Sequence, residues 1–440
     1  MATVVPKRIA TTIMNSLKGG VVPRVGLEYI AVGRKPEIEA LLHDVDIIEE
    51  GGATFRFVVG KYGSGKSFLL HTIRNYAMEK KFVVIDADLS PEKRLIGSRG
   101  QGLATYKELI KNMSTKTKPD GGALNLILEK WIFSIQTQII QEDQISVEDT
   151  QMIPRVETKI YETINELSDM IYGFDFAKVI SLYWKASKTG DDDQKARAIK
   201  WLRGEYTTKS EARKELGVNA IVSDDNWYEY VKLFSMFLVK AGYKGMLILI
   251  DELVNIFKIP HSITRQYNYE KILAMYNDTL QGKAKYIGII MGGTPQCIED
   301  TRKGIFSYEA LKSRLEDGRF VSDDMRDLLA PIIKLKPLNN EELFVLIEKL
   351  SEIHANLYGY TAIITDEDLV AFLKIEYERV GADTNITPRE IIRDFIELLN
   401  IMSQNPEKKI TEMLGSGAFE FAKNQISDEA IHAGFAEFEL

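Results

Sequence analysis

The sequence predicts an α/β protein: a parallel sheet covered by helices, interrupted by a helical insertion and followed by an all-α unit. Five short apolar runs rich in β-branched residues alternate with helical patterns, which is typical of parallel strands buried on both faces. The first run ends in a glycine-rich loop, and the third ends in two acidic residues. The five runs span residues 55–59, 82–85, 246–250, 286–291 and 332–335.

Composition is that of an ordinary protein with a sizeable core. The 440 residues carry a net charge of −8, which argues against an overall positive coat but leaves room for a local basic surface. Cys297 is the one cysteine, so no internal disulfide forms and a reducing cytoplasm is the simplest compartment. Charges interrupt every apolar run before it reaches the length of a membrane helix, and we expect no membrane contact.

The run at 55–59 leads into GKYGSGKS, residues 60–67. This spacing is that of a phosphate-binding loop, whose backbone N–H groups point at the phosphates while a helix N-terminus adds its dipole. Lys66 would reach the β- and γ-phosphates, and the Ser67 hydroxyl would bind Mg²⁺. The residues expected to hold ATP here are Gly60, Gly63, Ser64, Gly65, Lys66, Ser67 and Phe68.

The run at 246–250 places Asp251 and Glu252 at its carboxyl end, where ligands bind in open α/β sheets. Asp251 is suited to hold Mg²⁺ through water. Glu252 is suited to orient and deprotonate an attacking water, which favours hydrolysis over transfer of phosphate to another molecule. The alternative is two acids that merely start a helix.

Two further polar residues follow the acid pair. The fourth run ends in MGGTP, and Thr294 is the candidate to reach between the acids and the γ-phosphate; the alternative is an incidental residue in a glycine turn. Arg314 ends a helical stretch before the fifth run and is the candidate to stabilise charge on a neighbouring subunit's γ-phosphate. Lys312 and Arg319 compete with Arg314 for this role, and a surface salt bridge is the alternative.

Between the second and third runs lies a stretch far longer than a crossover helix needs, so we expect a helical insertion at about residues 90–225. Helices are predicted at residues 124–141, 157–170, 193–203 and 227–241, with GDDD at 190–193 as a solvated turn and helix start. Two basic groups in the insertion are either solvated helix faces or nucleic-acid contacts. They are Lys93, Arg94, Arg99, Lys107, Lys111, Lys116 and Lys118, and Lys185, Lys188, Lys195, Arg197, Lys200 and Arg203.

Helical patterns at residues 341–354, 366–378 and 388–402 predict the all-α unit. Thr387 caps the last of these helices and Pro388 occupies its first position, so Arg389 falls in the first turn. A cation is unfavourable there unless an anion such as the nucleotide phosphates lies near, the alternative being a solvated arginine. The tail at 416–440 is either a final docked helix or a handle for a partner. The predicted domains are 1–35, 36–335, 336–402 and 403–440.

The order of these motifs resembles that of AAA+ ATPases, especially the origin-recognition and replication-initiator branch. AVGRKPEIEALL, residues 31–42, is similar to that branch's box beside the adenine, which implies a contact from Val32. The resemblance implies that Thr294 is sensor 1, Arg314 the arginine finger and Arg389 the sensor 2 of a helical lid. The residues after Met402 are too few for that branch's winged-helix domain, so we expect DNA contact to come from another surface or a partner.

A closer resemblance covers most of the chain. The segments LKGGVVPRVGLEYIAVGR, WLRGEYTTKSEARKELGV, GGTPQCIEDTRKGIFSYEALKSRL and NITPREIIRDFIELLN resemble the ATP-binding proteins of BREX-type phage-defence systems, the BrxD-like family. The resemblance implies a Mg²⁺-dependent ATPase that forms a homo-oligomer or assembles with defence proteins such as a helicase, and that acts on DNA. The rival interpretation is a nucleotide-gated assembly switch with little DNA contact.

Overall fold

The computed structural model describes residues 5–144, 146, 149–168, 170–316, 318, 326–360, 364–380, 387–405 and 413. The chain divides into two compact units, which are described separately. One unit runs from Arg34 to Pro337 and contains the sheet. The other combines Met1–Gly33 with the segment that begins at Leu338.

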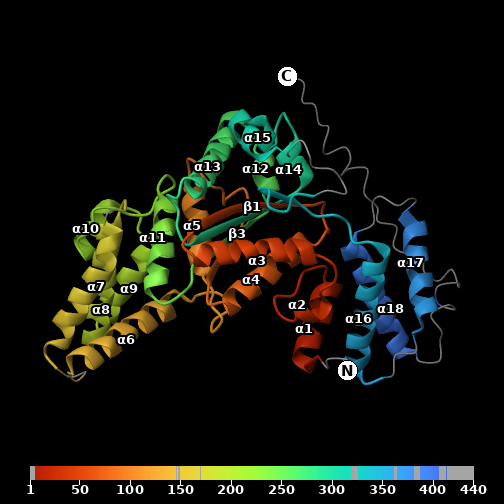
Figure 1. Ribbon diagram of the computed structural model, residues 1–440, viewed down its shortest axis with the longest axis horizontal. Helices are drawn as coiled ribbons and strands as arrows, with labels where there is room; N and C mark the ends of the chain where they lie inside the picture. The colour runs from red at the N-terminus through yellow and green to blue at the C-terminus, as the bar shows by residue number, and fades with distance from the viewer. Residues whose placement is uncertain are drawn as a thin grey trace. The chain divides into compact units, whose positions relative to one another are not determined.

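A five-stranded, wholly parallel sheet forms the centre of the larger unit (Figure 1). Its strands are β1 Ala53–Val59, β2 Val83–Asp88, β3 Met246–Asp251, β4 Ile287–Gly293 and β5 Ile332–Lys334, in the order β2-β3-β4-β1-β5. All five predicted strands are confirmed, because each is an apolar run that the sheet buries. The strand that leads into the phosphate loop therefore lies between β4 and β5.

Alternate residues of the strands enter two separate apolar layers. Val58, Val84 and Leu249 pack with α3 (Lys35–Glu49) and α4 (Lys66–Glu79) on one face. Phe57, Ile85 and Ile248 pack on the other face with residues of α5 (Gln101–Lys111), α11 (Trp227–Lys240) and α13 (Ser262–Leu280). Because both faces are covered, β1, β3 and β4 consist almost entirely of buried residues. Arg56 in the middle of β1 is a buried polar exception, and it pairs with Asp44 at 2.6 Å.

The stretch between β2 and β3 is helical, as predicted. GDDD begins a helix as expected, since Asp191 accepts a hydrogen bond of 2.9 Å from the backbone of Gln194. The structure differs from the prediction in that α7 starts earlier, because Pro154 is tolerated in a first helical turn. In addition, α5, α8 and α10 were not predicted as individual helices. Besides α5 and α11, the helices are α6 Leu124–Asp143, α7 Met152–Ser168, α8 Gly173–Thr189, α9 Asp192–Leu202 and α10 Lys209–Leu216.

Helices also connect β3 to β4 and β4 to β5. After β3 come α12 (Val254–Phe257) and the long helix α13, and after β4 come α14 (Pro295–Glu299), a 3-10 turn at Ile305–Ser307 and α15 (Glu309–Leu315). Figure 1 shows α12, α13, α14 and α15 gathered on the side of the sheet away from α3 and α4.

The smaller unit is all-helical within its described residues, and its three predicted helices are confirmed. The sequence did not predict that α1 packs against α16 and α18. Helix α1 therefore contributes to the same core as these two helices. Ala10, Ile13 and Leu17 of α1 are buried, as are Ile347 and Phe395. The expectations for the tail at 416–440 lie outside the described residues. The helices are α1 Lys7–Lys18, α2 Leu27–Ile30, α16 Asn340–Tyr358, α17 Asp366–Val380 and α18 Pro388–Gln404.

Candidate nucleotide-binding site

The loop after β1 has the backbone that its glycines permit. Gly63 and Gly65 have φ values of 77° and 90°, in the left-handed region that other residues rarely enter. At Gly60 a side chain would place Cβ 2.3 Å from the Ser64 hydroxyl, so only glycine fits. The loop therefore closes tightly over its own residues before α4 begins at Lys66.

Two side chains at the start of α4 contact the loop and the end of β3. The Lys66 ammonium lies across the loop and donates to the carbonyls of Gly60 and Lys61 at 2.9 and 3.0 Å. The Ser67 hydroxyl donates to Asp251 Oδ2 at 3.3 Å, which joins α4 to the end of β3. The first N–H groups of a helix have no acceptor within it. These groups fit an anionic ligand with a divalent cation.

The residues of the loop also leave room for such a ligand. A Cβ added at Gly65 would meet no atom within 4 Å, so the inner side of the loop is open there. The buried Ser64 hydroxyl has no hydrogen-bond partner among the described residues. A buried polar atom of this kind is costly unless a ligand or water satisfies it. Both observations agree with a nucleotide phosphate held against the loop.

Asp251 extends over the neighbouring strand. Its Oδ1 accepts a 2.8 Å hydrogen bond from the Glu252 backbone, and a Cβ at Gly292 of β4 would lie only 2.2 Å from that oxygen. The absence of a side chain at Gly292 is what allows the Asp251 carboxylate to lean across β4, in the direction of β1 and the phosphate loop.

This contact gives a testable result. The Gly292→Ala variant is expected to lose Mg²⁺-dependent ATP affinity by about 10–100-fold, the usual effect of disturbing a group that supports a metal ligand. Binding of ATP in EDTA should change little, because the loop itself is unaltered. Calorimetric titrations with and without Mg²⁺ separate the two. Gly318→Ala is the control, since a Cβ there meets nothing within 4 Å. Equal Mg²⁺ dependence in both variants would contradict the role of Gly292.

Glu252 follows β3 in an unusual backbone conformation. Its φ is 63°, a conformation that costs a residue other than glycine roughly 1–3 kcal/mol and persists only where the surrounding structure holds it. Leu253 holds it here, because its side chain is buried and its N–H donates to the Gly292 carbonyl at 3.0 Å. The turn leaves Glu252 exposed at the carboxyl edge of the sheet, free to meet a water molecule.

Thr294 lies between the acid pair and the phosphate loop, because β4 lies between β3 and β1. The Gly60 N–H donates to the Gly293 carbonyl at 3.1 Å, so Thr294 directly follows a residue bonded to the loop. Its side chain is partly exposed, and its carbonyl accepts a 3.0 Å bond from the Cys297 thiol. Burial raises the pKa of that thiol to about 11, so Cys297 stays protonated. The sensor role of Thr294 stays a prediction.

Arg34 is a loop contact that sequence reasoning missed. Its Nη2 donates to the Ser64 carbonyl at 2.9 Å, and the residue is only 8% exposed. Glu37 holds the arginine at 3.9 Å and is itself paired with Arg326 at 2.8 Å. The buried Arg34 guanidinium thus stabilises the backbone of the phosphate loop at Ser64. In the sequence GRKPE, Arg34 directly precedes the Lys-Pro start of a helix, which could have drawn attention to it. The segment was interpreted only as a box beside the adenine.

Asp88 is a second residue that was missed. It ends β2 and is the register partner of Asp251 in the adjacent parallel strand, so the two carboxyl groups share one face of the sheet. Partial burial, followed by the charges of Asp251 and Asp86, raises the pKa of Asp88. The carboxylates of Asp86, Asp88 and Asp251 repel one another, and a cation bound between them would reduce this repulsion. The sequence clue was the acidic stretch that follows the predicted strand at 82–85, in which Asp88 lies three residues beyond the predicted end.

Arg314 is exposed on α15. Its Nη1 donates to the Ala310 carbonyl at 2.6 Å within the helix. Burial raises the pKa of Tyr276, and the guanidinium groups of Arg56 and Arg314 oppose that rise, so Arg314 lies within electrostatic range of Tyr276. Tyr276 packs on Phe55, near the start of β1, whereas the loop follows its end. Lys312 is partly exposed on the same helix, and Arg319 lies outside the described residues.

Arg389 and Val32 belong to the smaller unit. Arg389 lies in the first turn of α18, as predicted, and its Cδ is 3.8 Å from the position of a Cβ on Gly20. The N–H and hydroxyl of Thr387 donate to the Glu390 carboxylate at 3.0 and 2.9 Å, which fixes the start of this helix. Val32 is partly exposed. The roles of both residues at the nucleotide stay predictions.

The basic residues of α8 and α9 are largely matched with acids. Lys185 pairs with Glu157 at 2.7 Å, and Lys200 pairs with Glu211 at 2.6 Å. Lys195 and Arg197 are similarly placed against Glu129 and Glu215, at 3.2 and 3.9 Å. This face is therefore an ion-paired helix surface, and it leaves little excess charge for nucleic acid.

Comparison with known proteins identifies a family for the chain. The family model of the BREX system ATP-binding protein BrxC/D matches residues 5–417, and this match includes the phosphate loop, the acid pair and both units. None of the curated proteins matches the chain in sequence. Each helix in the described part of the chain is too short or too polar to cross a membrane. The chain belongs to the family of BREX system ATP-binding proteins BrxC/D.

Proposed function

We propose that the protein is a Mg²⁺-dependent AAA+ ATPase of a BREX defence system, which couples ATP binding and hydrolysis to assembly and to action on DNA. One arrangement supports this proposal: Lys66 lies across the loop, and Ser67 is hydrogen-bonded to Asp251. Glu252 follows Asp251 directly, with a positive φ. Loop, metal-binding groups and a water-facing carboxylate come from three elements that the fold brings to one edge of the sheet. We expect the assembly to form in the cytoplasm.

Each residue of the site has a defined task in this proposal. Lys66 binds the β- and γ-phosphate oxygens, and Ser67 and Asp251 hold Mg²⁺, which supplies neutralising charge when bound. Glu252 takes a proton from a water whose oxygen attacks the γ-phosphorus in line with the β–γ bridging oxygen. The bond to that oxygen breaks, and ADP and phosphate are formed. Thr294 orients the water or the γ-phosphate, and Arg389 links the helical unit to the nucleotide state.

Replacing Lys66 by Ala tests the location of the site. The variant is expected to lose tight ATP binding, by about 2–5 kcal/mol, because the phosphates lose a charged partner within the loop. Calorimetry measures the affinity directly. Lys61→Ala is the matched control, since Lys61 is an exposed lysine of the same loop. Unchanged affinity in Lys66→Ala would exclude residues 60–67 as the main nucleotide site.

A second function, a nucleotide-gated assembly switch, is favoured by the ion pairing of α8 and α9 and by the net charge of −8. In that case ATP binding joins partner proteins such as a helicase, and hydrolysis only resets the complex. The two functions differ in their response to DNA. An ATPase rate that rises when duplex DNA is added to the pure protein supports action on DNA, and a rate that stays constant supports the switch.

A further inference from the structure

The segment from Lys111, the last residue of α5, to Gly122 is a well-anchored loop on the edge of the sheet. Ser114 exchanges two backbone hydrogen bonds with Val84 of β2, at 2.8 and 3.0 Å. Thr115 and Lys118 close a tight turn with bonds of 3.1 and 3.0 Å, and the Gly122 N–H donates to the Lys111 carbonyl at 2.8 Å. The loop therefore presents its side chains from a fixed backbone, as a preformed binding surface does.

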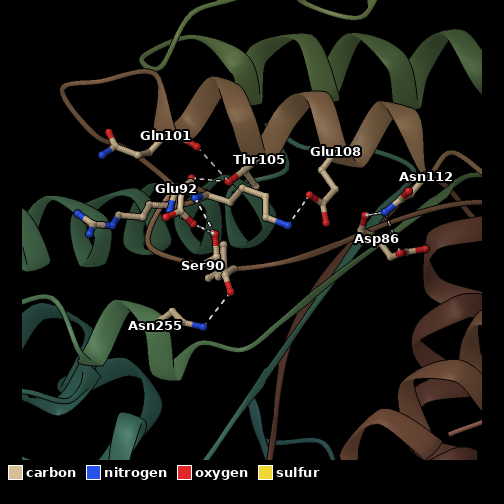
Figure 2. A network of polar contacts seen from close by, with 11 residues as sticks. Asp86, Ser90, Glu92, Gln101, Thr105, Glu108, Asn112 and Asn255 are labelled. Carbon is tan, nitrogen blue, oxygen red and sulfur yellow. Dashed lines mark hydrogen bonds and ion pairs between the residues drawn. The ribbon is translucent and has the colours of Figure 1, made fainter. Parts of the chain in front are cut away.

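The side chains it exposes are mainly ammonium groups, together with the Thr117 hydroxyl, whereas Ser114 and Thr115 are buried. Lys111, Lys116 and Lys118 are exposed, as are Lys107 on α5 and Lys130 on α6. The Lys130 ammonium donates to the Thr117 hydroxyl at 3.3 Å, which brings α6 to the same surface. The acids that face this surface are Asp120 in the loop, Glu79 of α4, which pairs with Lys116 at 2.5 Å, and Glu108 of α5, which pairs with Lys93 at 2.5 Å (Figure 2). Cations thus exceed acids.

The chemistry of this surface favours a phosphate backbone over other partners. Residues 111–122 contribute no large exposed apolar side chain, whereas Tyr76 of α4 and Phe133 of α6 are exposed one helical turn from Glu79 and Lys130. Protein interfaces are rich in aromatic residues and poor in lysine, so a protein partner is disfavoured at residues 111–122. Single strands bind through aromatic side chains that stack on bases, and residues 111–122 expose none. Lysines and the exposed Thr117 hydroxyl instead suit the phosphates of a duplex.

The loop is also tied to the candidate nucleotide site. Arg74 lies on α4, the helix that begins at Lys66, and is 2% exposed. Its Nη2 donates to the Ser114 hydroxyl at 2.8 Å and to the Pro119 carbonyl, and its Nε lies 3.5 Å from Asp86. The Asn112 amide donates to the backbone and side chain of the same aspartate at 2.9 and 3.2 Å, as Figure 2 shows.

We propose that residues 111–118 contact the phosphate backbone of duplex DNA, and that Arg74 and Asn112 connect this contact to α4 and β2. The proposal rests on the proposed function, because it gives the DNA-dependent ATPase the surface on which DNA acts. A duplex on the loop would restrain the segment that holds Arg74, and α4 carries Lys66 and Ser67 at its other end. DNA would in this way alter the hydrolysis rate from outside the site.

The test compares two double variants with the same change in charge. Lys111→Gln/Lys118→Gln removes two ammonium groups from the loop, and Lys209→Gln/Lys214→Gln removes two from the exposed surface of α10. Binding of a labelled duplex is measured by fluorescence anisotropy over a range of salt. Each lost phosphate contact should reduce the log–log salt slope by about 0.9, and two should weaken binding at 0.1 M salt by about 10–60-fold.

We expect this loss in the loop variant only, together with loss of DNA stimulation of the ATPase while basal hydrolysis and ATP affinity stay unchanged. An unaltered salt slope in the loop variant overturns the inference and leaves DNA binding to another surface. An equal loss in the α10 variant overturns it as well. A wild-type protein that hydrolyses ATP but binds anionic vesicles or an acidic protein in place of the duplex overturns both the inference and the DNA part of the proposed function, whereas the ATPase itself stands.

Discussion

The Glu252→Gln variant is expected to bind ATP as tightly as the wild type and to hydrolyse it about 10²–10⁴-fold more slowly. The amide keeps the size and polarity of the carboxylate but does not accept a proton from water. Glutamine meets the same backbone cost at φ 63° as glutamate, so the turn after β3 should persist. Asp251 still receives the backbone N–H of residue 252, and the groups that hold the metal stay in place.

Three measurements check this expectation. Calorimetry gives the ATP affinity, phosphate release gives the rate, and size-exclusion chromatography with ATP shows whether the inactive variant accumulates an ATP-bound assembly. Glu28→Gln is the matched control, because it makes the same chemical change at an exposed glutamate of α2. A Glu252→Gln variant that hydrolyses ATP at nearly the wild-type rate would move the general base to another carboxylate, and Asp88 is then the nearest acid by strand register.

The fold was predictable where local sequence and burial agree. Each strand is an apolar run buried on both faces, and the phosphate loop needs its glycines for local reasons of backbone geometry. Helix α8 was missed because its apolar residues occupy most of its circumference, which hides the helical period. The packing of α1 against α18 was missed because the two helices are remote in sequence, and no local pattern predicts such a contact.

Some residues of the candidate site could likewise be predicted from the local sequence, and others could not. Lys66 and Ser67 were predicted from the spacing of the glycine-rich loop, and Asp251 from its place at the end of an apolar run. The hydrogen bond between Ser67 and Asp251 shows that the fold brings these two residues together. Arg34 and Asp88 were missed because their importance depends on a carbonyl and a strand neighbour that are remote in sequence. Gly292 was regarded as part of a turn, whereas its requirement comes from the carboxylate of another strand.

Arg314 is expected to act on the site of a neighbouring subunit. The Arg314→Ala variant keeps the phosphate loop and the acid pair but offers no guanidinium, whereas Glu252→Gln offers the guanidinium but has no base. Each variant alone should be nearly inactive, since arginine fingers contribute roughly 10³–10⁵-fold in well-studied NTPases. Arg302→Ala is the control, because Arg302 is another exposed arginine of the same region.

Mixing the two inactive variants distinguishes action on a neighbour from action within one chain. If Arg314 serves a neighbour, a Glu252→Gln subunit completes the site of an Arg314→Ala subunit, and ATPase activity partly returns. The exposure of Arg314 on α15 is compatible with this outcome, because an exposed guanidinium is accessible to another subunit. Differently tagged chains verify that subunits exchange. Exchange without recovered activity would assign Arg314 to its own chain and make Lys312 and Arg319 the next candidates. A protein that stays monomeric with ATP would place the recipient site on a partner protein.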